Sequence, residues 1–330
     1  MVSIKLQFPT KSQTNREHTN FYQGISGRKV RRTKGSNSPT WLFTFMQGQV
    51  ERLRLAGKNR TAETYAATLR SFCRFRQGED VGLEQMTSEL METYECYLRA
   101  SGLTPNSTSF YARILRAVYN RAVEQGLVED CKPFKHVYTG VDKTVKRALP
   151  FELLKEIKAL DLREHPALAF ARDMFMLSFY LRGMSFIDMA FLRKSDLRSG
   201  YITYRRRKTG QQLIIAWTEE MQDILNRYPI NPTKYLLPII TGDDINYRNV
   251  GYNINYNLKR VAAMVGITVP LTMYVARHSW ASAARELNIP ISVISEGMGH
   301  DNEATTRIYL ASIDTRVVDH ANQLILDAFR

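Results

Sequence analysis

Four stretches with helical apolar spacing follow one another between residues 38 and 130, and this series most constrains the fold. The first opens at a Ser-Pro pair and stops at Gly57, both common helix boundaries. The third covers residues 88–100, and the fourth runs from Thr104 to Gly126. The second places six residues on one face: Ala62, Tyr65, Ala66, Leu69, Phe72 and Cys73. Each apolar face needs a partner, so residues 38–130 predict a four-helix domain with arginines on its outer faces.

From residue 150 onward the pattern predicts a second, mostly helical domain with one β-hairpin. The segments YITYRRRK and QQLIIAW predict two strands joined at Thr209-Gly210. The segment 166–182 is apolar almost all round and should form a buried helix. Further helices are expected near residues 218–227, 248–265, 272–287, 291–296, 301–310 and 315–329. The fold class is therefore mainly α with a small β-hairpin, with a second domain over 150–330 and a linker over 131–149 between the two domains.

The chain is strongly basic, and its first 37 residues carry half of the excess charge. The net charge is +14 and the isoelectric point is near 9.7. Residues 1–37 hold eight Lys or Arg and one Glu, a net charge of +7. The densest cluster is Arg28, Lys29, Arg31 and Arg32. Because nucleic acid is the commonest polyanion for such a protein, residues 1–37 are interpreted as a DNA-contacting arm, with a solubilising tail as the alternative.

Short motifs that the sequence lacks argue against several classes of protein. The three cysteines, Cys73, Cys96 and Cys131, show no metal-binding spacing and predict reduced thiols in a cytoplasmic protein. No apolar run is long enough to span a membrane, and the first residues lack a secretory apolar segment. There is no HExxH, CxxC or P-loop motif, and the acidic pair Asp243-Asp244 has no third ligand nearby. A cytoplasmic protein close to the chromosome, without a metal or a cofactor, is expected.

The last third of the chain contains a few polar residues in an order that suits phosphodiester chemistry. Arg277-His278 is followed by Gly299-His300, then by a Thr-Thr pair, and Tyr309 is the ninth residue after His300. A phosphoryl transition state spreads negative charge over oxygens that need fixed donors. Arginine offers a planar, permanently charged fork, His300 can add a third donor, and a tyrosine can attack phosphorus and hold the product as an ester.

These residues resemble the signature of the tyrosine recombinase, or phage integrase, family. The tail MGHDNEATTRIYLASID is similar to the family's glycine-histidine, threonine-threonine and tyrosine signature, and YVARHSWASAA is similar to its second-arginine box. The segment RGMSFIDMAFLRKSDL looks typical of the subgroup of conjugative-transposon integrases and DNA invertases. The resemblance covers about 130 residues, from Arg182 to Tyr309.

The resemblance implies a catalytic set and a reaction. In the family, tyrosine cuts one DNA strand, holds it as a 3′-phosphotyrosine and rejoins it to another strand. The implied nucleophile is Tyr309, and Arg277 and His300 grip the phosphate. Lys208, at the tip of the predicted hairpin, would protonate the leaving oxygen. Because the covalent intermediate conserves bond energy, neither ATP nor a metal is required.

The first catalytic arginine departs from the family pattern. The family places it three residues before an acid and seven before a leucine-arginine pair, which here gives Asp188 as the acid and Ser185 in place of the arginine. Arg182 lies one helical turn earlier. If the helix continued, positions 182 and 185 would share a face, so Arg182 is the candidate substitute.

Other positions are candidates for accessory roles. Tyr274 stands three residues before Arg277, where the family often has histidine or lysine, and either contacts the phosphate or only packs. His278 and Asp188 are interpreted as structural, the latter as a residue that orients an arginine. The hairpin run is expected to contact backbone phosphates, or in part to be only solvated: Arg205, Arg206 and Arg207.

By resemblance, the expected partner is double-stranded DNA with inverted-repeat recombination sites. The chain should be a monomer or dimer on its own and a homotetramer on synapsed DNA, with no membrane partner. The reaction is integration, excision or inversion of a mobile element, with a lean toward an invertase or a simple integrase. Two alternatives stay open: a type IB topoisomerase that relaxes DNA, and a DNA-binding regulator with a degenerate site.

Overall fold

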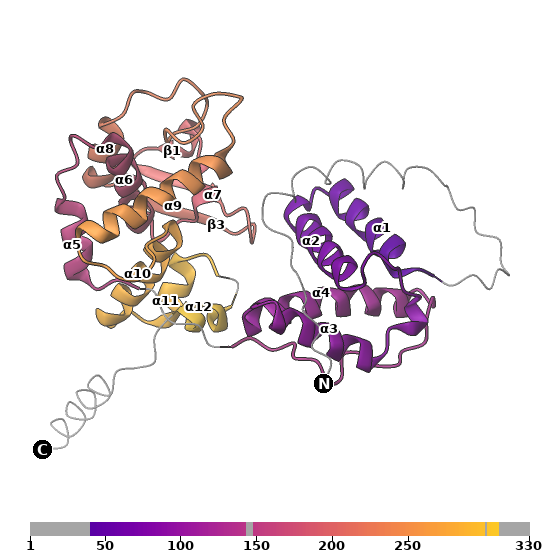
Figure 1. Ribbon diagram of the computed structural model, residues 1–330. Coiled ribbons are helices and arrows are strands. Elements are labelled where there is room, and N and C mark those ends of the chain that lie inside the picture. Colours follow the sequence, from indigo (N-terminus) through magenta and orange to yellow (C-terminus); the bar gives the residue numbers. More distant parts are fainter. Residues whose placement is uncertain (1–39, 143–147, 301, 310–330) are drawn as a thin grey trace, which may run out of the picture. The chain divides into compact units, whose positions relative to one another are not determined.

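The computed structural model describes residues 40–142, 148–300 and 302–309, with the backbone alone at residues 308 and 309. The chain divides into two compact units, residues 1–143 and 144–330. The predicted basic arm over 1–37, with Arg28, Lys29, Arg31 and Arg32, lies outside the described residues, as does the helix expected near 315–329. The described part is mostly helical with one small antiparallel sheet (Figure 1), which confirms the predicted fold class.

The first unit contains the four helices that the apolar spacing predicted. They are α1 Leu42–Leu55, α2 Asn59–Phe75, α3 Ser88–Ala100 and α4 Pro105–Glu124. Thr87 and Thr104 cap α3 and α4, because each hydroxyl accepts a hydrogen bond from a backbone N–H in the first turn. The core is formed by Phe72, Tyr94, Leu115 and Tyr119 with their apolar neighbours.

The start of the predicted linker belongs to this core. Phe134 and Val137 are buried against it, and the backbone N–H of Cys131 donates to the Tyr119 hydroxyl. Pro and Gly signalled a break in helical structure here, but they say nothing about whether the apolar side chains between them are buried.

The second unit surrounds a three-stranded antiparallel sheet with helices. The helices are α5 Phe151–Ala159, α6 Pro166–Tyr180, α7 Phe186–Ala190, α8 Glu219–Asn226, α9 Tyr247–Met264, α10 Met273–Glu286, α11 Ile291–Gly297 and α12 Glu303–Tyr309. The apolar α6 packs against α9 and α10, as its pattern predicted (Figure 1). None of the helices in the described ranges is long and apolar enough to cross a membrane.

The sheet is built from β1 Leu197–Arg198, β2 Tyr201–Arg205 and β3 Gln212–Ala216, in that order. Ile202 pairs with Ile215, and both side chains are buried in the core. The alternate residues face outward, which is the two-residue period of a half-buried hairpin. The short β1 extends the predicted hairpin by one strand.

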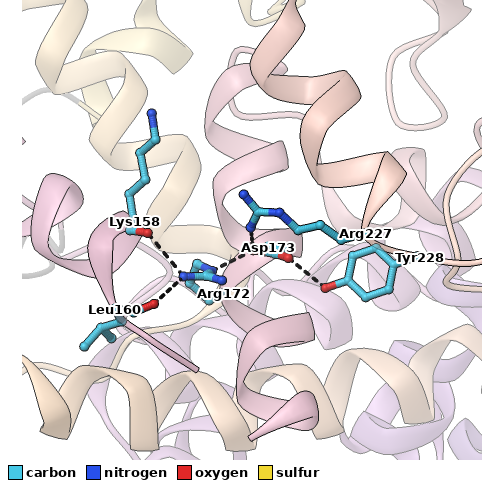
Figure 2. Close-up of polar contacts among 6 residues, drawn as sticks. All are labelled: Lys158, Leu160, Arg172, Asp173, Arg227 and Tyr228. Atoms are coloured by element: carbon cyan, nitrogen blue, oxygen red, sulfur yellow. Dashed lines mark hydrogen bonds and ion pairs between the residues drawn. The ribbon is translucent and has the colours of Figure 1, made fainter. Parts of the chain in front are cut away.

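A buried ionic cluster joins α5, α6 and the end of α8 (Figure 2). Asp173 accepts hydrogen bonds from Arg172 Nε at 2.6 Å, Arg227 Nη1 at 3.0 Å and the Tyr228 hydroxyl at 2.8 Å. Arg172 also donates through Nη1 to the carbonyl oxygens of Lys158 and Leu160, at the end of α5. Burial, followed by the nearby Asp173 carboxylate, raises the pKa of Tyr228. The cluster therefore pairs a buried carboxylate with its own cations and serves to hold the helices together.

Candidate active site

Arg277 lies at the centre of the candidate site, on α10, and is buried. Its Nη1 donates to the carbonyl oxygen of Gly183 at 2.8 Å, and its Nη2 donates to that of Met298 at 2.7 Å. Nη2 also lies 2.8 Å from Nε2 of His300. Because both terminal nitrogens donate hydrogen bonds, the guanidinium keeps one orientation, which bidentate binding of a phosphate requires.

Gly183 permits the close approach of the neighbouring loop to Arg277. Its φ is +71°, and a Cβ there would lie 2.7 Å from Arg277 Cα. Any other residue would therefore be strained and would also collide with the backbone of α10.

His300 is positioned by the way α11 ends. The N–H of His300 bonds to Ser295 O and that of Gly299 to Glu296 O, and Gly299 has a φ of +66°. This is the Schellman arrangement, which explains the glycine before the histidine. The ring is buried, and its Nδ1 lies 2.8 Å from the Thr306 hydroxyl.

The charge state of His300 follows from its surroundings. Burial, and then the positive charges of Arg277, Arg206 and Lys208, lower its pKa to about 4. The imidazole is therefore neutral at pH 7. Because a guanidinium only donates, the Arg277 contact makes Nε2 an acceptor and leaves the ring proton on Nδ1. That His300 donates to a phosphate stays a prediction; toward Arg277, its Nε2 is the acceptor.

Arg206 is a buried second arginine at this site. It follows β2, and its Nη1 donates to the carbonyl oxygen of Gly299. A Cβ on Gly299 would lie 3.2 Å from Arg206 Cδ, so this glycine also lets the hairpin approach α11. The sequence grouped Arg206 with two solvent-facing neighbours, yet the structure brings it to His300. The strand alternation gave a signal, since Ile202, Tyr204 and Arg206 are on one side.

The hairpin tip carries Lys208, whose side chain is exposed. Two contacts of the preceding residue hold the hairpin in place. The backbone N–H of Arg207 donates to the Asp188 carboxylate at 2.9 Å, and the Arg207 guanidinium lies 4.2 Å from the centroid of the Phe191 ring. Arg205 is exposed and donates to Gly210 O within the hairpin. Of the three arginines, only Arg205 has its described contacts within the hairpin itself. Arg206 and Arg207 connect the hairpin to other parts of the unit.

Asp188 orients the backbone of an arginine and contacts the residue that caps α7. Besides the N–H of Arg207, its carboxylate accepts the Ser185 hydroxyl at 2.6 Å. Ser185, at the position where the family has its arginine, is the N-cap of α7. Tyr204 lies close by: burial and then Asp188 raise its pKa, whereas Arg277, Arg206 and Arg182 lower it.

Arg182 lies at the same site, but not for the reason that the sequence suggested. The helix α6 ends at Tyr180, and Arg182 has a φ of +57°, so positions 182 and 185 do not share a helix face. The N–H of Arg182 donates to Phe179 O and that of Gly183 to Ser178 O, which is a Schellman turn. Arg182 occupies the left-handed position where glycine is usual. A Cβ on Gly297 would lie 3.8 Å from Arg182 Cδ, which places the side chain beside α11.

The remaining candidates are on α10 and α12. Tyr274 is 55% exposed, and its ring packs edge-on against His278, with centroids 4.8 Å apart. Thr306 is fully buried on α12, and Tyr309 is three residues later on the same helix. The Tyr309 side chain is outside the described atoms. Within the described ranges, no three His, Cys, Asp or Glu side chains are grouped closely enough to hold a metal ion.

Two family models match the chain in succession. Residues 41–137 match the phage integrase SAM-like domain, and residues 152–316 match the phage integrase family. The second match covers half of the chain and includes every residue of the site just described. The chain belongs to the phage integrase family. It is thus a tyrosine recombinase or integrase by family, as the motifs indicated.

Curated relatives support this membership over most of the chain. A tyrosine recombinase of Pseudothermotoga lettingae is 24% identical over 276 residues, which cover 80% of this chain and 92% of the relative. The tyrosine recombinase XerA of Thermococcus kodakarensis is 28% identical over 221 residues, 64% of this chain and 73% of the relative. The family supports site-specific recombinase activity.

Solved structures share the fold at lower identity. A lambda integrase tetramer bound to a Holliday junction superposes with a TM-score of 0.66 at 17% identity, over 84% of this chain and 79% of that one. The Tn1549 transposon integrase bound to transposon right-end DNA gives a TM-score of 0.65 at 14% identity, over 87% of this chain and all of that one. Both likenesses concern the fold.

Proposed function

We propose that this phage integrase family member is a site-specific DNA recombinase that cuts and rejoins DNA through a 3′-phosphotyrosine at Tyr309. The observation that supports this best is the arrangement of Arg277, Arg206 and His300. Two buried guanidinium groups from separate elements meet at the turn that leads into the helix of Tyr309. Fixed cations that are buried away from water stabilise a phosphoryl transition state strongly.

Each residue has a defined role in this proposal. Arg277 and Arg206 bind the non-bridging oxygens, and Arg182 adds charge from the side of α11. Tyr309 Oη attacks phosphorus and loses its proton to a neighbouring base, while the bond to the 5′-oxygen breaks. Lys208 gives that oxygen its proton, because an alkoxide is a poor leaving group. His300 orients Arg277, and Asp188 holds the hairpin that carries Lys208.

The substrate and assembly follow from the same chemistry. The 5′-hydroxyl of a second strand can attack the phosphotyrosine, so bond energy is kept and neither ATP nor a metal enters the balance. The domain organisation that we propose is a basic arm over 1–37, a DNA-clamping unit over 38–130 whose core also includes residues of 131–137, a linker over the rest of 131–149 and a catalytic unit over 150–330. A protein of this kind would act with chromosomal DNA in the cytoplasm. The known structures of a lambda integrase dimer on a core site and a tetramer on a Holliday junction support DNA with paired sites as the partner, with two copies at each site and four in the synapse.

A nicked suicide substrate tests the proposal. Wild type and Tyr309→Phe would be incubated with nicked duplexes from the inverted repeats that flank the gene. We expect a covalent protein–DNA band with wild type and none with Tyr309→Phe. Tight binding by wild type without a band would overturn the proposal in favour of a DNA-binding regulator. Relaxation of a supercoiled plasmid that has no paired sites would favour a type IB topoisomerase.

A further inference from the structure

Thr306 contacts the site from the helix that bears the nucleophile. Its side chain is fully buried on α12, and its hydroxyl lies 2.8 Å from Nδ1 of His300. On the other side of the ring, Nη2 of Arg277 lies 2.8 Å from Nε2. The three side chains therefore form a chain of hydrogen bonds from α12, through the loop after α11, to α10.

The direction of these hydrogen bonds is fixed by Arg277. Because a guanidinium has no acceptor, the His300 nitrogen that it contacts carries a lone pair. The single ring proton of the neutral imidazole is then on Nδ1, where it is donated to the Thr306 hydroxyl. The other tautomer would place two N–H groups against each other at Nε2, so the Arg277 contact excludes it.

We infer that Thr306 is a positioning residue: its hydroxyl accepts the Nδ1–H that the Arg277 contact requires of His300, and so holds the ring with its Nε2 lone pair toward the Arg277 fork. The inference rests on the proposed function and deepens it. Because Tyr309 is three residues after Thr306 on α12, the same hydrogen bond links the seating of the nucleophile's helix to the arginine. A displaced α12 would therefore misplace Tyr309 and would also remove the hydroxyl that holds the His300 ring.

The neighbouring Thr305 provides a matched control. It is half-buried, and its backbone N–H bonds to Asn302 O. Replacing either threonine with valine keeps the shape and removes one hydroxyl. Thr306→Ser keeps the hydroxyl and loses only a methyl group.

The experiment measures the rate of covalent complex formation on the nicked substrate with the full chain. We expect Thr306→Val to lower the rate by about tenfold or more, the change that follows when a buried hydrogen-bonding group loses its partner. Thr306→Ser and Thr305→Val should stay close to wild type. DNA affinity, measured by fluorescence anisotropy, should be the same for all four proteins.

The tautomer itself is read by ¹⁵N NMR, because a protonated and a lone-pair ring nitrogen have different chemical shifts. The chain has six histidines, so His300→Gln assigns the signals. We expect Nδ1–H in wild type and a changed tautomer signature in Thr306→Val. Nε2–H in wild type would overturn the inference even if the valine variant failed to fold. Equal rates for wild type and Thr306→Val, equal losses at Thr305 and Thr306, or a slow Thr306→Val with an unchanged signature would overturn it as well. A wild type that forms no covalent band would instead count against the proposed function.

Discussion

Two groups of arginines in the second unit are held in different ways. In the cluster of α5, α6 and α8, the Asp173 carboxylate contacts Arg172 and Arg227, so charge is met by charge (Figure 2). At the candidate site, Arg277 and Arg206 donate to carbonyl oxygens of Gly183, Met298 and Gly299. The first arrangement neutralises its cations. In the second, the cations act on a neighbour and help to lower the pKa of His300.

This difference separates an arginine that supports the fold from one that serves chemistry. Backbone carbonyls orient a guanidinium without cancelling its charge as a carboxylate does. The full charge is then available to an anionic ligand, and the two guanidinium groups keep the site positive at neutral pH, where His300 itself carries no charge. The comparison predicts that changes at the two clusters affect different quantities.

The largest effect is expected on stability at the Asp173 cluster. Asp173→Ala removes the carboxylate from three donors and leaves Arg172 buried, which should lower the free energy of unfolding by about 3–5 kcal/mol. Urea denaturation measures this. The control is Asp161→Ala, which breaks an exposed pair with Arg163 and should change stability little. Equal losses in the two variants would contradict the assigned role of Asp173.

The next effect is expected on rate at Arg277. Arg277→Lys keeps a positive charge but loses the planar fork, so covalent complex formation should fall by about 10²–10³-fold while DNA binding is largely kept. Quench-flow or gel assays on the nicked substrate give the rate. Arg172→Lys serves as the control, since its arginine lies in the other cluster, and the fraction that is folded should cleave normally. An Arg172→Lys variant that stays folded but loses cleavage would contradict the distinction between the two arginine groups.

A smaller effect with two opposite signs is expected at Arg182. This residue occupies a left-handed position, so Arg182→Gly should raise the free energy of unfolding by about 1 kcal/mol. If its charge serves the site, the same variant should cleave more slowly than wild type. Thermal denaturation and the nicked-substrate assay give the two readings. A stabilised variant with full activity would leave Arg206 as the substitute for the missing family arginine.

The smallest effect at neutral pH is expected from the titration of His300. Its pKa is about 4 in the folded protein and near 6.5 in the unfolded chain. Between these values only the unfolded chain binds the proton, so the stability that is present above pH 6.5 should be lost as the pH falls toward 4. His300→Gln should lack this part of the pH dependence. Denaturation curves at several pH values show whether the two proteins differ in that window.

The sequence predicted the four helices of the first unit because caps and apolar faces are local. Thr87 and Thr104 precede α3 and α4, and the boundaries agree within a few residues. Short elements were missed where no long apolar face exists, as at α7 and β1. The turn at Arg182 was missed because the left-handed position was filled by arginine, whereas glycine is the usual signal.

At the site, the order of polar residues along the chain identified Arg277, His300 and Tyr309 as candidates. In the structure, these residues lie on α10, after α11 and on α12. Only the tertiary structure decided which further residues belong to the site and which groups donate or accept its hydrogen bonds. Arg206 reaches Gly299 across 93 positions, and the tautomer of His300 depends on Arg277 and Thr306 from two other elements. Hydrogen-bond direction and burial depend on which groups meet in space, and spacing along one strand or helix does not contain that information.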